Sequence, residues 1–292
     1  MTIGFVGLGD MGLAMARNLL AAGHAVKGFD LNPQRQQMFA DAGGTVAADL
    51  ETVGQDVDAV FVMVLNGRQA IDVVLGLKDS MRKGSAVVLT ATIARDEALT
   101  IAALLMEAGI ELIDSPVSGG RPGAEAGSLT LMLAAKSEVL AAHRGMLEAV
   151  SGTIHHVSEQ PGDGQTVKAA LQAIFGCTFA GIYEALVLGS KAGLSGQVMA
   201  DVFGSAGCAS PVLKSVVELI IDRKFEGTGS GIRTMHKDLS VTVGMSREVG
   251  ATIPTTAAAY ELFQAGKCRY PEGDNQAIVQ VLEEIAGTRV AR

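Results

Sequence analysis

The chain has 292 residues, of which 48% are hydrophobic and 18% are charged. This composition excludes an intrinsically disordered protein, and the length suffices for two domains that each bury a core. There are 23 Lys and Arg residues against 31 Asp and Glu, and the net charge of −8 argues against a nucleic-acid-binding protein. The longest apolar run, residues 59–65, is far too short to span a membrane, so we expect no membrane partner.

The three cysteines are few, scattered and odd in number. They form no Cys-x-x-Cys pair and no cluster with histidine, so we expect neither a disulfide framework nor a metal site. The N-terminal residues have no basic stretch and no cleavage pattern of a signal peptide. Together these features predict a cytoplasmic protein.

Apolar runs of strand length alternate with helix-forming stretches through the first half of the chain. This alternation predicts an α/β fold, a doubly wound Rossmann-type sheet with helices on both faces. Because residues 59–65 are apolar at every position, we expect that strand to be buried on both faces. The expected strands are residues 3–6, 25–29, 59–65, 86–89, 111–113, 129–133 and 153–157; the expected helices are residues 11–22, 33–42, 97–108 and 138–149.

The second half of the chain contains almost no strand pattern after Gly162. We therefore predict a dinucleotide-binding domain over residues 1–162 and an all-helical domain over residues 163–292, linked by a long helix. That helix, residues 166–192, is long, predominantly apolar and rich in Ala, Leu and Ile, so we expect it to be buried all round, in part against other subunits. Further helices are expected at residues 197–203, 211–222, 237–249, 255–265 and 275–286.

A glycine fingerprint follows the first expected strand and opens the first helix: Gly7-Leu8-Gly9-Asp10-Met11-Gly12. In this context, the first glycine permits a tight turn, the second lets a pyrophosphate approach the backbone, and the third allows close helix–strand packing. The helix N-terminus then stabilises the phosphate charge. The alternative is a glycine-rich turn that binds nothing.

Asp30 ends the second expected strand, 18 residues beyond Gly12. A carboxylate there accepts hydrogen bonds from ribose hydroxyls and repels a 2′-phosphate, so it predicts NAD rather than NADP. The alternative is a helix N-cap, a role for which Asn32 is better placed. Arg35 lies close enough in the sequence to leave the cofactor preference open.

Four segments together resemble the β-hydroxyacid dehydrogenase family, whose members include 3-hydroxyisobutyrate dehydrogenase. They are residues 7–18 (GLGDMGLAMARN), 114–120 (DSPVSGG), 162–168 (GDGQTVK) and 237–239 (KDL). The resemblance covers essentially the whole chain. It implies a Rossmann domain joined by a long helix to an all-helical domain, in a homodimer or homotetramer.

Ser118-Gly119-Gly120 offers a hydroxyl and two unhindered backbone N–H groups after a strand, which can hold a carboxylate. An ordinary turn is the alternative from the residues alone. The resemblance implies that this segment binds the carboxylate of the substrate.

Lys168 lies in the first turns of the long apolar helix. Partial burial beside the positive nicotinamide ring is expected to lower the pKa of this amine, which could then act as a general base. The alternative is a lysine that extends its ammonium into water. The resemblance implies that Lys168 is the catalytic acid/base, and that Gln172, on the same helix face, contacts the substrate. Most members have Asn at this position, and members that act on L-threonate resemble the chain in having Gln.

The remaining expected contacts concern the cofactor. Val64, Leu65 and Asn66 follow an expected strand, where the carboxyl ends of strands face the cofactor. The resemblance implies that Thr92 touches the nicotinamide ribose and that Lys237 binds the cofactor from the helical domain, with Asp238 orienting it. An exposed pair on a helix is the alternative for these last two residues.

Taken together, the residues and the resemblance predict an NAD-dependent dehydrogenase for a small hydroxy acid, with L-threonate or a similar four-carbon sugar acid as the expected substrate. The alternative substrates are 3-hydroxyisobutyrate and tartronate semialdehyde (2-hydroxy-3-oxopropionate). A hypothesis from another class is a non-catalytic NAD-binding sensor, against which the presence of Lys168 argues.

Overall fold

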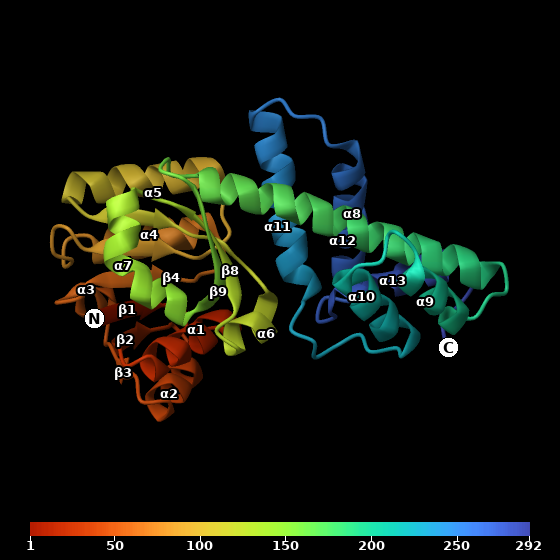
Figure 1. Ribbon diagram of the computed structural model, residues 1–292, viewed down its shortest axis with the longest axis horizontal. Helices are drawn as coiled ribbons and strands as arrows, with labels where there is room; N and C mark the ends of the chain where they lie inside the picture. Colours follow the sequence, from red (N-terminus) through yellow and green to blue (C-terminus); the bar gives the residue numbers. More distant parts are fainter. The chain divides into compact units, whose positions relative to one another are not determined.

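A nine-stranded sheet organises the N-terminal part of the chain in the computed structural model, which describes residues 1–292 (Figure 1). The strand order is β3-β2-β1-β4-β5-β6-β8-β7, with β9 beside β8. Neighbouring strands from β3 to β6 are parallel, whereas β8 is antiparallel to β6 and β7. The strands are β1 (Thr2–Val6), β2 (Ala25–Phe29), β3 (Thr45–Val46), β4 (Ala59–Val62), β5 (Ala86–Leu89), β6 (Glu111–Asp114), β7 (Val117–Ser118), β8 (Leu129–Ala134) and β9 (Ser151–Ser158).

Helices cover both faces of this sheet, which confirms the predicted doubly wound α/β fold. Side chains from α1, α6 and α7 pack in one core, and side chains from α3, α4 and α5 pack in another. The helices are α1 (Asp10–Ala21), α2 (Pro33–Asp41), α3 (Leu50–Gly54), α4 (Gly67–Leu77), α5 (Arg95–Ala108), α6 (Gly120–Glu125) and α7 (Ser137–Ala149).

Strand β4 shows how an entirely apolar run is buried on both faces. Phe61 belongs to one core and stacks on Phe5 with ring centroids 5.5 Å apart, while Val60 and Val62 belong to the other core. The expected strand was too long, because β4 ends at Val62 rather than at residue 65. Past the end of β4, Met63 still donates its N–H to the Val6 carbonyl, and the chain then leaves the sheet.

The C-terminal part is helical, as predicted. Its helices are α8 (Asp163–Lys191), α9 (Gly196–Ser205), α10 (Pro211–Ile221), α11 (Ile232–Glu248), α12 (Pro254–Arg269) and α13 (Val279–Ala286), with a 3₁₀ turn at Asn275–Ile278. Its core includes Phe179 and Tyr183 of α8, whose rings stack with centroids 6.3 Å apart, and Phe263 of α12. The chain divides into two compact units, Met1–Lys168 and Ala169–Arg292, so that α8 begins in the first and continues in the second.

Helix α8 is long and apolar enough to cross a membrane by length and composition alone. A core helix of a water-soluble protein passes the same test, and Phe179, Tyr183 and Leu186 of α8 lie in the core of the helical unit. Within the single chain α8 is not covered all round, because Ile174 is 65% exposed and Leu188 is 73% exposed. The expected burial of these positions against other subunits stays a prediction. One apolar stripe of α8 thus faces outward.

Candidate active site

The glycine fingerprint forms the turn from β1 into α1, and each glycine meets a different physical demand. Gly7 has a φ of +92°, which L side chains rarely adopt, and a Cβ there would lie 2.1 Å from the Met63 carbonyl oxygen. A Cβ on Gly12 would lie 1.9 Å from the Gly7 carbonyl oxygen. Gly9, the N-cap of α1, has open space where its Cβ would be and offers no side-chain acceptor to the helix amides. The turn therefore fits a pyrophosphate that approaches the backbone at Gly9 and the N-terminus of α1.

Asp30 follows β2 and is held beside this turn. Its Oδ2 accepts the Leu8 N–H at 2.6 Å, and its Oδ1 accepts the Asn32 N–H at 2.8 Å. The N-cap of α2 is Asn32, whose Oδ1 accepts the Gln34 N–H at 2.9 Å. Asp30 is thus not the helix cap, and its carboxylate is fixed next to Leu8 of the fingerprint.

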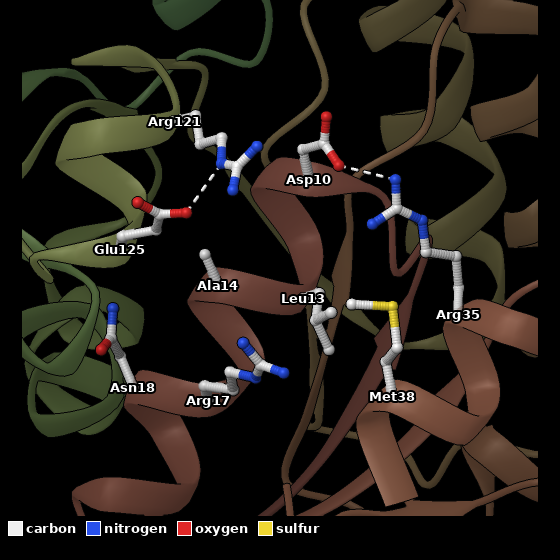
Figure 2. A pocket seen from close by; sticks show the side chains of 9 residues that line it. All are labelled: Asp10, Leu13, Ala14, Arg17, Asn18, Arg35, Met38, Arg121 and Glu125. Atoms are coloured by element: carbon white, nitrogen blue, oxygen red, sulfur yellow. Dashed lines mark hydrogen bonds and ion pairs between the residues drawn. The ribbon is translucent and has the colours of Figure 1, made fainter. Parts of the chain in front are cut away.

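A hollow of about 230 Å³ lies over α1, between residues of α2 and residues of α6 (Figure 2). Asp10 on α1 pairs with the Arg35 guanidinium of α2 at 2.6 Å, and Arg121 of α6 pairs with Glu125 at 2.7 Å. Asp10 is the only residue expected to bind the cofactor that lines this hollow. Arg35, which left the preference between NAD and NADP open in the sequence analysis, is thus paired with a carboxylate of the fingerprint.

The expected cofactor residues beyond β4 and β5 lie at the carboxyl edge of the sheet. Val64 and Leu65 follow β4, and Leu65 is 73% exposed. Asn66 has a structural role that the sequence analysis did not assign, since its side chain caps α4 by accepting the Gln69 N–H at 2.9 Å. Thr92 lies two residues before Ala94, the N-cap of α5, in the connection that follows β5.

The segment expected to hold a carboxylate links β7 to α6. Ser118 ends β7, and the backbone then turns through Gly119 with a φ of +125° and Gly120 with a φ of +58°. Two consecutive residues with positive φ explain why both are glycine. The turn presents a hydroxyl and backbone N–H groups without neighbouring side chains from the two glycines, which suits an anionic group.

The sequence analysis missed a buried polar pair beneath these segments. Gln165 is 1% exposed and Asp114 is fully buried. The Gln165 side chain donates to Asp114 Oδ1 at 2.8 Å and to the Ala91 carbonyl at 3.1 Å, and accepts the Ile93 N–H at 3.0 Å. Burial raises the pKa of Asp114 to about 6, although the N–H groups that donate hydrogen bonds to its carboxylate act to lower this pKa. Asp114 begins the second of the four quoted segments, and Gln165 lies within the third.

Lys168 lies one turn after Gln165 on α8, and only 7% of it is exposed. A lysine that extended its ammonium into water would be far more exposed, so the structure disfavours that alternative. Val167 and Ala169 flank it, and the Ala169 side chain is buried.

In the helical unit, Gln172 of α8 meets the segment that contains Lys237. The Gln172 amide donates to Asp238 Oδ2 at 2.5 Å, and Lys237 Nζ lies 2.7 Å from Asp238 Oδ1. Asp238 is 4% exposed, so Lys237 and Asp238 are not an exposed helix pair. Asp238 thus links the two residues that the resemblance places near substrate and cofactor. No group of three or more His, Cys, Asp or Glu side chains is arranged to hold a metal ion.

Comparison with family models and known proteins identifies the family. Residues 2–158 match the NAD binding domain of 6-phosphogluconate dehydrogenase, and residues 162–282 match the NAD-binding domain of NADP-dependent 3-hydroxyisobutyrate dehydrogenase. The chain is 32% identical to a 2-(hydroxymethyl)glutarate dehydrogenase from Eubacterium barkeri, over 99% of this chain and 97% of that protein. It is 30% identical to an L-threonate dehydrogenase from Escherichia coli strain CFT073, over 97% of this chain and 95% of that protein.

A crystal structure of 3-hydroxyisobutyrate dehydrogenase from Salmonella typhimurium is similar to this chain with a TM-score of 0.87 and 30% identity, covering 96% of this chain and 99% of that one. These relatives share the fold and match nearly the full length of the chain. Their names refer to three different substrates. The chain belongs to the 3-hydroxyisobutyrate dehydrogenase-like β-hydroxyacid dehydrogenase family, NAD(P)-dependent enzymes that act on the CH–OH group of hydroxy acids.

Proposed function

We propose that this protein is an NAD-dependent dehydrogenase that oxidises L-threonate or a similar four-carbon sugar acid to a 2-oxo acid, with Lys168 as the catalytic acid/base. The observation that carries the proposal is the burial of Lys168, one turn beyond Gln165, which is bonded to both residues that flank Thr92. An amine in such surroundings is placed for proton transfer rather than for contact with water.

The roles of the residues follow from their chemistry. Gly9 and the N-terminus of α1 would hold the pyrophosphate of the cofactor, and Asp30 would bind its ribose hydroxyls. Val64, Leu65, Asn66, Thr92 and Lys237 are the further residues proposed to contact the cofactor. When bound, the nicotinamide ring supplies the site that accepts the hydride.

The substrate carboxylate would accept hydrogen bonds from the Ser118 hydroxyl and from backbone N–H groups of Gly119 and Gly120. The neutral Nζ of Lys168 takes the proton of the substrate hydroxyl as the hydride leaves its carbon. In the reverse direction, the Lys168 ammonium returns that proton to the carbonyl oxygen. Proton and hydride are thus both accounted for, and the alcohol becomes a ketone.

Two residues support the finer choices of cofactor and substrate. Asp30 favours NAD because a carboxylate beside Leu8 repels a 2′-phosphate, and Arg35 is paired with Asp10. Gln172 favours a sugar acid, since its longer amide changes the pocket relative to the Asn of most members. 3-Hydroxyisobutyrate and tartronate semialdehyde remain the alternative substrates, and a non-catalytic NAD-binding sensor is the alternative of another class.

The test is NADH formation from a panel of hydroxy acids, measured for the wild type and for Lys168→Ala. The proposal expects L-threonate to give the highest kcat/KM with NAD, and expects Lys168→Ala to lose most of kcat while NADH still binds. Equal inactivity of both proteins on every acid, with intact NADH binding, would instead support the sensor. A higher kcat/KM with NADP than with NAD would refute the role given to Asp30.

We also propose a cytoplasmic homodimer or homotetramer, with residues 163–292 as the substrate and oligomerisation domain. The exposed Ile174 and Leu188 on α8 support this, since burying such side chains against another subunit is favourable. Light scattering of the wild type and of Leu188→Glu tests it. A monomeric wild type would refute the oligomer.

A further inference from the structure

We propose that Gln165 is a positioning residue, which acts with Asp114 to fix the first turn of α8, and hence Lys168, relative to Thr92 and to the Ser118 turn. The inference rests on the function proposed for Lys168. It concerns two residues that take no part in the chemistry of the reaction itself.

The Gln165 carboxamide is fully engaged by three hydrogen-bonding partners from two other segments of the chain. Its Nε2 donates to the Ala91 carbonyl at 3.1 Å and to Asp114 Oδ1 at 2.8 Å, and its Oε1 accepts the Ile93 N–H at 3.0 Å. An amide has two N–H donors and a carbonyl acceptor, so both donors and the acceptor are used. Because the side chain is buried, each lost bond would leave a buried polar group without its partner.

Asp114 serves as an N-terminal cap for α8 from outside the helix. Its Oδ2 accepts the N–H of Gly162 at 2.9 Å and the N–H of Gln165 at 3.4 Å. The first amides of a helix have no partner within the helix, and a carboxylate at this end also interacts favourably with the helix dipole. The last residue of β6 therefore fixes where a helix of 29 residues begins.

Close approach of the helix to the sheet depends on Gly164. A Cβ on Gly164 would lie 2.6 Å from the Met132 carbonyl oxygen and 3.0 Å from Asp114 Oδ2. The first turn of α8 therefore lies directly against the ends of β6 and β8, where a displacement of a few tenths of an ångström would be resisted by backbone atoms.

The network contacts or adjoins three of the segments that have roles in the proposed function: those of Thr92, Ser118 and Lys168. Ala91 and Ile93 flank Thr92, Asp114 precedes Ser118 by four residues, and Gln165 precedes Lys168 by three. Three residues are nearly one helical turn, so a tilt or slip of the first turn moves the Lys168 amine with it. Proton transfer needs the amine within hydrogen-bond reach of the substrate hydroxyl, and a misplacement of about 1 Å costs about 100-fold in rate.

The decisive variant is Gln165→Met, which keeps the length of the side chain and removes all its strong hydrogen bonds. We expect kcat to fall by about 10- to 100-fold, while KM for the hydroxy acid and the affinity for NADH, measured by fluorescence, change by less than about threefold. The matched control is Gln276→Met, since Gln276 is also buried but donates to the Lys224 carbonyl in the helical unit. We expect this control to lower Tm and to keep kcat.

Exchanging the carboxylate of Asp114 and the amide of Gln165 between the two positions adds a readout that a purely structural role would not give. In Gln165→Glu, a carboxylate faces Asp114 Oδ1, and in Asp114→Asn an amide N–H₂ can face the Gln165 N–H₂. In the double variant, the amide introduced at position 114 can donate to the carboxylate introduced at position 165, although the Ala91 carbonyl stays without its donor. We expect a kcat above that of either single variant, that is, a rescue in a double-mutant cycle.

Hydrogen exchange separates this inference from the proposed function. We expect Gln165→Met to speed amide exchange over residues 166–168 and to leave exchange in the helical unit unchanged. If the wild type oxidises no hydroxy acid, the proposed function fails and the exchange result alone decides whether Gln165 anchors the helix. The positioning role would be overturned by unchanged exchange or by a kcat of Gln165→Met equal to that of the wild type. It would also be overturned if Gln276→Met lowered kcat as much as Gln165→Met does.

Discussion

The buried carboxyl of Asp114 makes the stability of the fold depend on pH in a direction that can be worked out. Its pKa is raised by burial from 3.8 to about 6 in the folded protein. Between these two values, the folded state binds a proton that the unfolded state has released, so the free energy of unfolding decreases as the pH rises. The shift of about two pKa units corresponds to a total loss of about 3 kcal/mol in the free energy of unfolding. This loss is complete once the pH is above the pKa of the folded state.

The measurement compares the wild type with Asp114→Asn, which does not titrate at this position. Between pH 5 and pH 7.5, the titration of Asp114 changes the free energy of unfolding only over the pH unit from 5 to 6. The free energy of unfolding of the wild type should therefore fall by about 1.4 kcal/mol relative to that of the variant. Urea unfolding at the two pH values gives both free energies, and the difference between the proteins cancels the titration of all other groups. A difference that is constant with pH, or that grows in favour of the wild type as the pH rises, would refute the reasoning.

Further predictions concern the cofactor turn. Gly9→Ala should leave Tm nearly unchanged because its Cβ would enter open space, and should weaken NADH binding, measured by fluorescence, by about tenfold. Gly12→Ala should destabilise the protein by about 3 kcal/mol in urea unfolding, since its Cβ would overlap the Gly7 carbonyl oxygen. Asp30→Ala should raise KM for NAD and lower the ratio of kcat/KM for NAD to that for NADP by about tenfold. An unchanged ratio would contradict the proposed contact with the ribose.

Much of the fold could be predicted because local pattern and tertiary environment agree in it. Strands β2 and β5 have the predicted bounds. Strand β5 (AVVL) is a short apolar run, and β2 (AVKGF) lies between residues that favour turns, Gly23 before it and Asn32-Pro33 after it. Strands β3 and β7 were missed because two residues carry no periodicity. Helix α4 was missed as well, since Val73, Val74 and Gly76 are poor helix formers, and its amphipathic face and the Asn66 cap outweigh them.

In the candidate site too, some residues could be predicted from the sequence and others could not. The fingerprint and the Ser118 turn could be found because the residues that form each of them are consecutive in the sequence. The pair of Asp114 and Gln165 could not, because its partners are 51 residues apart and only the sheet brings them together. The same holds for Gln172 and Asp238, 66 residues apart. Sequence spacing predicts a turn or a helix face, whereas a buried polar network needs the tertiary fold.

The net charge of −8 would suggest a poor partner for an anionic dinucleotide and an anionic acid. The geometry of the turns removes this conflict, because neither proposed anion site depends on an arginine. Backbone N–H groups at the start of α1 and at the turn after Ser118 supply the positive potential, and Arg35 is paired with Asp10. Such sites require backbone without Cβ atoms, so the 36 glycines of the chain are a better guide to its ligands than its charged residues are.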